Sequence, residues 1–195
     1  MKRIFDIFGA VAGLIFILPF LPFIALAIFF EDGLPIFVKL DRISQGKIIK
    51  VYKFRSMVKN AHKLKAVLSH FNERKDGSFF KIRNDPRLTR VGKLLRKFRL
   101  DEFPQFLNVL KGELALVGPR PHEPEEMLQY PPEFKKLYFA KGGLTGLSQV
   151  NGASALPFRK ELEFDLYYLQ NQSLWLDLKI LLKTVWVFFS DPTGV

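Results

Sequence analysis

The sequence predicts a mostly helical α+β protein with an apolar membrane segment near its N-terminus, a small β-hairpin and amphipathic helices at the membrane interface. Residues 7–30 carry no charge, residues 36–58 partly alternate apolar and polar side chains, and residues 87–111 place apolar side chains at helical spacing. The chain has 195 residues and no cysteine, which excludes disulfides and thiolate metal sites. Its formal net charge of +11 implies an anionic partner: nucleic acid, a phospholipid surface or a phosphorylated substrate.

The apolar segment IFGAVAGLIFILPFLPFIALAIFF (7–30) is long enough for a membrane helix. As a straight helix it would measure about 36 Å, against a hydrocarbon core of about 30 Å. A signal peptide fits poorly, because the run is too long and Glu31-Asp32 follow without a small-residue cleavage site. Pro19 and Pro22 each remove a helical donor near the middle. The residues alone leave a kinked spanning helix and a re-entrant hairpin as open alternatives.

The middle of the chain predicts a hairpin followed by helices. Residues 36–58 favour a β-hairpin that turns at Ser44-Gln45-Gly46-Lys47, and the polar residues 59–75 favour a helix. Asp85-Pro86 marks a turn before the next helix. That amphipathic helix is expected over residues 87–98, with one apolar face formed by Leu88, Val91, Leu94, Leu95 and Phe98.

The rest of the chain predicts one more core helix, two loops and a terminal helix. The second helix should begin near Asp101 and stop at Gly112. Loops are expected at VGPRPHEPEE (117–126), rich in proline, and at KGGLTGLSQVNGAS (141–154), rich in glycine. The tail LWLDLKILLKTVWVFF (174–189) favours an interfacial helix, because tryptophan suits the membrane–water boundary; a buried helix is the alternative.

Two adjacent carboxylates, Asp101 and Glu102, directly follow the most basic part of the chain. Residues 81–99 hold eight Lys or Arg residues against one Asp. One explanation is a helix start, where Asp is a favoured cap and Glu suits the first turn. The other is phosphate chemistry, because cations stabilise carboxylates and attract phosphate, and a carboxylate can attack phosphorus. Mg²⁺ needs only one or two carboxylates plus phosphate oxygens, so the pair could also hold that ion.

Other sites are weakly indicated. The sequence has no GxxxxGK[ST] loop and no HExxH helix, and His62, His70 and His122 lack metal-ligand spacing. The basic run alone would also suit a membrane-tethered nucleic-acid binder, but no recognised nucleic-acid-binding module is visible. A membrane-tethered, non-catalytic scaffold is a further alternative.

The motifs taken together resemble a known family. By their order and spacing the chain is similar to the bacterial sugar transferases, the small monotopic phosphoglycosyl transferases, over nearly its whole length. Besides the proline-broken apolar segment, the matching motifs are KRIFD (2–6), YKFRSM (52–57), DPRLTRVGKLLR (85–96), LDEFPQ (100–105), NVLKGELALVGPRP (108–121), GLTGLSQVNG (143–152) and EFDLYY (163–168).

This resemblance implies transfer of a sugar-1-phosphate from a UDP-sugar to a polyprenyl (undecaprenyl) phosphate, which initiates assembly of a bacterial surface glycan or glycoprotein glycan. It implies that Asp101 attacks the β-phosphate, releasing UMP and forming a covalent phosphosugar-aspartate, and that Glu102 helps hold Mg²⁺. The positions expected to contact phosphates are Lys53, Arg87, Arg90 and Arg120.

The resemblance also implies an organisation. Residues 1–35 would form a re-entrant helix-break-helix at Pro19 and Pro22, and residues 36–195 a catalytic domain associated with the lipid bilayer. The expected location is the cytoplasmic face of the bacterial inner membrane, with no nucleic-acid partner. The oligomeric state stays open, with a dimer as one alternative.

The chain departs from the family's pattern at several positions. Leu18 replaces a frequent Ser before the membrane proline, and Arg99 replaces a common Ser beside the carboxylate pair. Lys141-Gly142 occupies the position where the family's pattern has Arg-Pro, and Ala153 the position where many members have Arg. The last two departures bear on nucleotide or sugar contacts and leave the Asp-Glu pair intact.

Overall fold

The computed structural model describes residues 1–74, 76–77, 80–82, 84–152 and 155–190. In chain order the described elements are α1 (Lys2–Ile17), the 3₁₀ helix η1 (Leu18–Phe20), α2 (Leu21–Asp32), β1 (Phe37–Ser44), β2 (Lys47–Phe54), α3 (Leu64–Val67), η2 (Ser69–Phe71), α4 (Arg90–Lys97), η3 (Leu100–Gln105), α5 (Phe106–Lys111), β3 (Ala115–Val117), α6 (Pro124–Leu128), η4 (Pro132–Phe139), β4 (Gly143–Thr145), α7 (Leu147–Val150), α8 (Phe158–Gln170) and α9 (Leu174–Ser190). The predicted α+β class with mostly helical content is confirmed.

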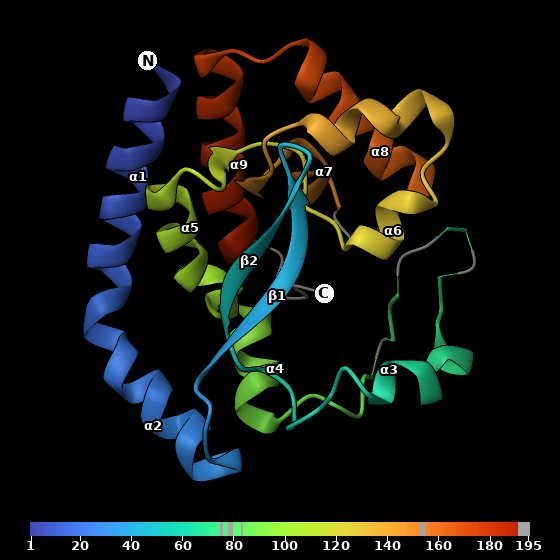
Figure 1. The fold of residues 1–195 in the computed structure, drawn as a ribbon. Coiled ribbons are helices and arrows are strands. Elements are labelled where there is room, and N and C mark those ends of the chain that lie inside the picture. The colour runs from blue at the N-terminus through green and yellow to red at the C-terminus, as the bar shows by residue number, and fades with distance from the viewer. Residues whose placement is uncertain (75, 78–79, 83, 153–154, 191–195) are drawn as a thin grey trace.

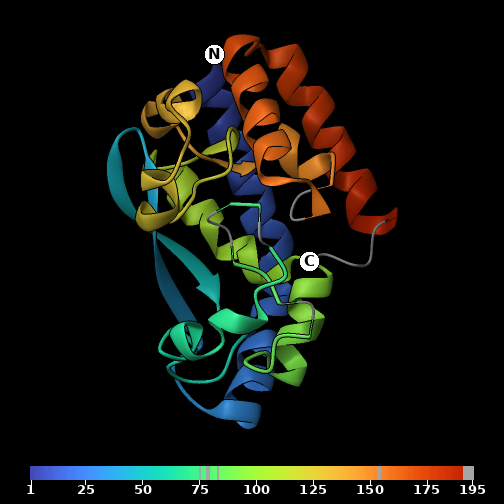
Figure 2. The same ribbon diagram turned by 90° about the vertical axis from the view of Figure 1, so that its right-hand side faces the viewer.

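The helices surround a small amount of sheet. Figure 1 shows α1 along one edge of the molecule, with α5 beside it and the β1–β2 hairpin crossing the middle. Figure 2 shows the hairpin on one flank and α8 and α9 on the other. The largest buried cluster lies where α1, β2, β3 and α9 meet; it contains Ala10, Val51, Val109, Leu114, Leu116, Val117, Val150, Tyr168 and Ile180.

The N-terminal helix breaks at the prolines. α1 ends at Ile17, η1 carries Pro19, and α2 begins one residue before Pro22. Figure 1 shows α2 continuing at an angle to α1, so the break predicted at these prolines is confirmed. The stretch Lys2–Asp32 is long and apolar enough to cross a membrane by length and composition. Whether it crosses or re-enters stays a prediction.

The predicted hairpin is confirmed with its turn. β1 and β2 pair antiparallel, and Ser44 lies opposite Lys47. The two turn residues, Gln45 and Gly46, have φ values of 55° and 71°, as a two-residue type I′ turn requires. The hairpin places Lys53 of β2 against η3.

The glycine-rich segment 141–154 is not simply a loop, and that prediction was wrong in part. Gly143–Thr145 forms β4, which pairs parallel with β3 and brings Gly143 opposite Ala115. A Cβ on Gly143 would lie 2.1 Å from the backbone nitrogen of Gly118, so only glycine permits this approach. Leu147–Val150 then forms the short helix α7. Ala153 and the residue after it lie outside the described residues.

The helices between residues 59 and 111 are shorter or start later than predicted. Of the segment 59–75, the described residues 59–74 contain one turn of α-helix, α3, and the 3₁₀ turn η2. α4 begins at Arg90, because Thr89 Oγ1 accepts a hydrogen bond from the Gly92 N–H at 2.9 Å and caps the helix there. The helix expected from Asp101 begins as the 3₁₀ helix η3 and becomes α-helical only at Phe106.

The C-terminal helix α9 is amphipathic. One face is buried through Asp177, which accepts hydrogen bonds from Lys2 Nζ and from the Tyr168 hydroxyl, each at 2.6 Å. The opposite face exposes Trp175 and Trp186, at 64% and 71%. This arrangement agrees with the expected amphipathic helix; its contact with a membrane interface stays a prediction.

Candidate active site

The two candidate carboxylates lie on η3, just after the basic helix α4. Arg99 separates the two helices and adopts a left-handed backbone conformation with φ of 47°. This conformation is costly for a residue with a side chain, and here it redirects the chain so that η3 packs against β2. Asp101 and Glu102 are therefore carried by a turn that the hairpin holds in place.

Glu102 faces a cationic cleft. Lys53 Nζ from β2 lies 2.6 Å from Glu102 Oε1, and the two side chains are 20% and 29% exposed. Burial alone would raise the pKa of Glu102, but Lys53 and Arg120 outweigh burial and lower that pKa to about 2. Glu102 is therefore ionised at neutral pH. The cleft is lined by Arg42, Val51, Lys53, Glu102, Gln105, Arg120, Pro121, Gly143, Leu144 and Gln149.

Asp101 has a different environment from its neighbour. Its side chain is buried, and burial raises its pKa, with Lys53 and Arg96 opposing the shift and Glu102 adding to it. Lys53 thus acts electrostatically on both carboxylates. One acid is held ionised and the other is shifted toward its protonated form, which is a pattern found at catalytic sites.

Arg120 is fixed from a distant part of the chain. Its backbone N–H donates to Asp165 Oδ2 at 3.1 Å, and the Ser148 hydroxyl donates to Asp165 Oδ1 at 2.7 Å. Asp165 is buried in α8; burial raises its pKa to about 7 although both hydrogen bonds lower it. Asp165 therefore joins the loop that carries Arg120 to the helix α7 that carries Gln149.

Several cleft residues were not among the predicted site residues. Gln149 is 8% exposed, donates through Nε2 to the Leu144 carbonyl, and keeps a buried Oε1 without a hydrogen-bond partner among the described residues. Arg42 contributes a second guanidinium from β1. Gln149 lies in the GLTGLSQVNG motif and Asp165 in the EFDLYY motif, so the sequence could have indicated both as site residues. Arg42 belongs to no motif, and nothing in the sequence indicated it as a site residue.

A model of one protein family matches residues 1–191, almost the entire chain, and that family is described as "Bacterial sugar transferase". The chain belongs to the bacterial sugar transferase family. The resemblance inferred from the motifs is therefore confirmed.

Named relatives agree with this assignment. The chain is 38% identical over 191 residues to a UDP-galactose-lipid carrier transferase of Erwinia amylovora, which covers 96% of this chain and 40% of the relative. It is 40% identical to an undecaprenyl-phosphate galactose phosphotransferase of Salmonella typhimurium, covering 94% and 39%. The exopolysaccharide production protein ExoY of Sinorhizobium fredii is 37% identical, covering 94% and 83%. The chain thus spans about two fifths of the first two relatives.

Two of the predicted phosphate-binding residues of this sugar transferase lie outside the cleft. Arg87 is buried and forms a two-point ion pair with Asp85, with its Nε and Nη2 donating at 2.9 Å and 2.5 Å. Arg90 begins α4, where its backbone N–H donates to Glu31 Oε1 at 2.6 Å. The structure therefore brings Lys53, Glu102 and Arg120 together, with Asp101 beside them. The phosphate-binding role of Arg87 and Arg90 stays a prediction.

The carboxylate pair fits an open magnesium site in its chemistry. Within the part of the chain that the structure describes, no group of three or more His, Cys, Asp or Glu side chains could form a closed metal site. Mg²⁺ commonly binds one or two carboxylates and takes its remaining ligands from phosphates and water. Glu102 suits this role because its carboxylate is ionised. The buried His122 pairs with the Tyr130 hydroxyl instead.

Proposed function

We propose that this chain catalyses phosphoglycosyl transfer, moving a sugar-1-phosphate from a UDP-sugar to a polyprenyl phosphate. The observation that carries the proposal is the Lys53–Glu102 ion pair at 2.6 Å, in a cleft that also contains Arg120 and adjoins Asp101. The names of the relatives support the substrates, since they specify a UDP-galactose-lipid carrier transferase and an undecaprenyl-phosphate phosphotransferase.

In the proposed first step, an Asp101 carboxylate oxygen attacks the β-phosphorus of the UDP-sugar. The bond between that phosphorus and the bridging oxygen breaks, and UMP leaves with the electron pair. In the second step, a phosphate oxygen of the polyprenyl phosphate attacks the same phosphorus and displaces Asp101. The sugar-phosphate is then joined to the lipid through a diphosphate, and the carboxylate is regenerated.

The difficulty of this reaction is that an anion attacks an anion. Lys53 and Arg120 place positive charge where the phosphates would bind, and these charges offset the repulsion. Lys53 and Arg96 also favour the ionised form of Asp101 against burial. Glu102 would hold Mg²⁺, which when bound neutralises further charge on the phosphates.

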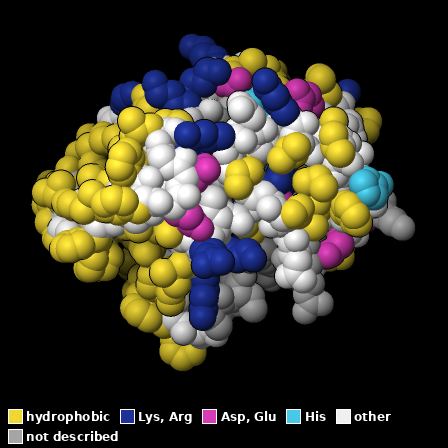
Figure 3. Space-filling model, turned by 90° about the horizontal axis from the view of Figure 1, so that it is seen from below, with side chains coloured by type: hydrophobic (Ala, Val, Ile, Leu, Met, Phe, Trp, Pro, Cys, Tyr) yellow, Lys and Arg dark blue, Asp and Glu magenta, His cyan; other side chains and the backbone are white. Residues whose placement is uncertain are grey.

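The exposed apolar surface supports a membrane location for this activity. Figure 3 shows hydrophobic side chains gathered on one side of the molecule, next to basic and acidic side chains. On α1 and α2, Phe8, Phe23 and Phe30 are 73%, 72% and 80% exposed. Such a surface would be unfavourable in water and favourable in lipid. We propose a re-entrant segment over residues 1–35, with the cleft on the cytoplasmic face.

The test uses purified protein with Mg²⁺ and single UDP-sugars, without an acceptor. UDP-galactose and UDP-N-acetylgalactosamine are the first choices, since relatives are named for galactose and N-acetylgalactosamine transfer. We expect release of UMP in an amount equal to the enzyme, and a phosphosugar adduct on Asp101 in the mass spectrum.

Two variants separate the proposal from its rivals. Asp101→Asn should form no adduct, whereas Glu163→Gln, an exposed change on α8, should behave as the wild type. Full turnover by Asp101→Asn would exclude the covalent scheme. Failure of every UDP-sugar to bind would favour a non-catalytic scaffold.

A further inference from the structure

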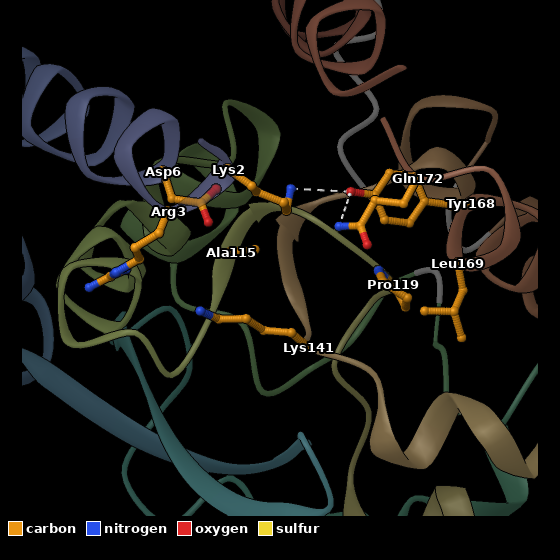
Figure 4. Close-up of a pocket in the computed structure, with 9 residues that line it drawn as sticks. All are labelled: Lys2, Arg3, Asp6, Ala115, Pro119, Lys141, Tyr168, Leu169 and Gln172. Carbon is orange, nitrogen blue, oxygen red and sulfur yellow. Dashed lines mark hydrogen bonds between the residues drawn. The ribbon is translucent and has the colours of Figure 1, made fainter. Parts of the chain in front are cut away.

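A second cavity lies apart from the candidate active site. It has a volume of about 310 Å³ and is formed where the start of α1 meets the end of α8, the start of β3, the segment after β3 and the segment before β4 (Figure 4). None of its lining residues lines the cleft that contains Glu102. Its lining is Lys2, Arg3, Asp6, Ala115, Pro119, Lys141, Tyr168, Leu169 and Gln172.

Most of the polar side chains of this cavity already have partners within the protein. Lys2 Nζ is neutralised by Asp177 at 2.6 Å and also donates to the Val117 carbonyl at 3.1 Å. Asp6 is buried and accepts a hydrogen bond from the Leu116 N–H at 3.0 Å. These bonds hold the cavity wall in shape.

No carboxylate among the described residues neutralises the positive charge of Arg3. Its guanidinium donates to the carbonyls of Val109 and Leu110 at the end of α5, and these acceptors are uncharged. Such a contact suits the negative end of a helix but does not neutralise the cation. Positive charge therefore remains at this wall of the cavity.

Lys141 differs from the other charged residues of the cavity because its side chain has no partner among the described residues. Figure 4 shows its side chain extending along the cavity toward Arg3 and Asp6. Among the described residues, Lys141 Nζ has no hydrogen-bond acceptor and no ion-pair partner. Burial lowers the pKa of Lys141, Arg3 and Lys2 lower it further, and Asp6 only partly opposes them. An ammonium that lies near two other cations, with no acceptor among the described residues, is a suitable partner for an anion.

We propose that this cavity binds a phosphate group, with Lys141 as a donor that has no acceptor among the described residues. Once Lys2 is neutralised by Asp177, Arg3 and Lys141 exceed Asp6 by one positive charge, which a phosphate monoanion or a phosphodiester would balance. Charged N–H donors and phosphate oxygens form strong hydrogen bonds. The volume admits a phosphate with a substituent.

The phosphate could come from a lipid headgroup or from solution. The lipid source is within reach, because α1 continues from Lys2 and Arg3 into the exposed apolar residues Ile4 and Phe8, at 59% and 73%. Basic residues beside an apolar surface attract anionic lipids. Inorganic phosphate offers the same oxygens without the lipid, and the experiment separates the two sources.

The experiment follows Lys141 directly. In the full-length chain in detergent, lysines are dimethylated with ¹³C, and the Lys141 resonance is assigned by its absence from Lys141→Gln. We expect this resonance to shift and saturate as inorganic phosphate is added. A Leu169 methyl resonance reports on the same cavity, and through it Lys141→Gln should show an affinity at least about tenfold lower. Lys141→Arg should retain binding.

The matched control is Lys136→Gln, an exposed change on η4 that should leave the affinity unchanged. In nanodiscs without free phosphate, a shift with phosphatidylglycerol and none with phosphatidylcholine identifies a lipid headgroup. A shift with inorganic phosphate alone identifies a soluble anion. If neither moves the Lys141 resonance of the wild type, or if Lys141→Gln binds phosphate unchanged, the proposal is overturned.

Discussion

Lys53 and Glu102 form an ion pair of 2.6 Å that joins β2 to η3, although the two residues are 49 positions apart in the chain. Lys53 acts electrostatically on two adjacent carboxylates whose pKa values shift in opposite directions, since the pKa of Glu102 is lowered to about 2 and that of Asp101 is raised. The β-hairpin therefore contributes to the electrostatics of the site as well as to the fold.

Lys53→Met should raise the pKa of Glu102 and reduce UMP release by about 10²-fold or more, because one charge that opposes phosphate repulsion is removed. The activity is measured with a UDP-sugar, and the Glu102 carboxyl is titrated by NMR. Lys50→Met is the matched control, since Lys50 is on the same strand, 61% exposed, and pairs with Asp41. Equal losses in the two variants would contradict a specific role for Lys53.

Asp165 should make the stability of the protein depend on pH. Its pKa is raised to about 7 in the folded state, against about 3.9 in an unfolded chain. An acid with a raised folded pKa contributes stability at low pH that is lost as pH rises, here between about 4 and 7, by roughly 1.4 kcal/mol per unit.

Asp165→Asn removes this titration and can still accept from Arg120 N–H and pair with Ser148. The unfolding temperature, measured across this pH range, should therefore fall less steeply with rising pH in Asp165→Asn than in the wild type. Parallel curves for the two proteins would show that Asp165 does not titrate in this window.

Features that depend on neighbouring residues could be predicted from the sequence, whereas those that depend on packing could not. The hairpin could be predicted because Gln45 and Gly46 turn locally. The carboxylate pair could be selected because the basic run precedes it directly. The role of Asp165 could not be predicted, because its partners Ser148 and Arg120 come close to it only through the packing of α7 and α8. Residue spacing contains no information on such contacts.

Contacts between distant residues also account for the predictions that differ from the structure. The sequence around Gly143 predicts a loop, and Gly143 becomes a strand residue by pairing with β3, opposite Ala115 and close against Gly118. The basic residues expected to contact phosphates look equivalent in sequence. The structure separates them, since Arg87 pairs with Asp85 whereas Arg120 lines the cleft. In both examples, contacts made in the folded chain determine the structure around the residue.

The path of the N-terminal helix can be tested with cysteines, because the chain has none of its own. A cysteine inserted between Met1 and Lys2 places one thiol before the proline break, and His62→Cys places one after α2 at an exposed position. A re-entrant helix returns to the side from which it entered, so a membrane-impermeant maleimide should label both positions from the cytoplasmic side. Labelling from opposite sides would establish a spanning helix and would move the cleft away from cytoplasmic UDP-sugars.

Asp101 should give the reaction an acid limb in its pH profile. Its carboxylate must be ionised to attack phosphorus, and burial raises its pKa, so the rate of adduct formation should rise with pH as the proton leaves. Arg96 opposes the shift. Arg96→Gln should therefore raise the pKa of Asp101 further and move the acid limb to higher pH.

The measurement is the pre-steady-state rate of UMP release against pH, with Lys97→Gln as the matched control. Lys97 is the next residue on α4, it is exposed, and it is not among the groups that shift the pKa of Asp101. Its variant should keep the wild-type profile. A uniform fall in rate for Arg96→Gln, without movement of the acid limb, would mean that Arg96 acts by holding α4 against the segment after β2, where its Nε donates to the Ser56 hydroxyl at 3.1 Å. A moved limb with an unchanged plateau would assign its effect to the charge on Asp101.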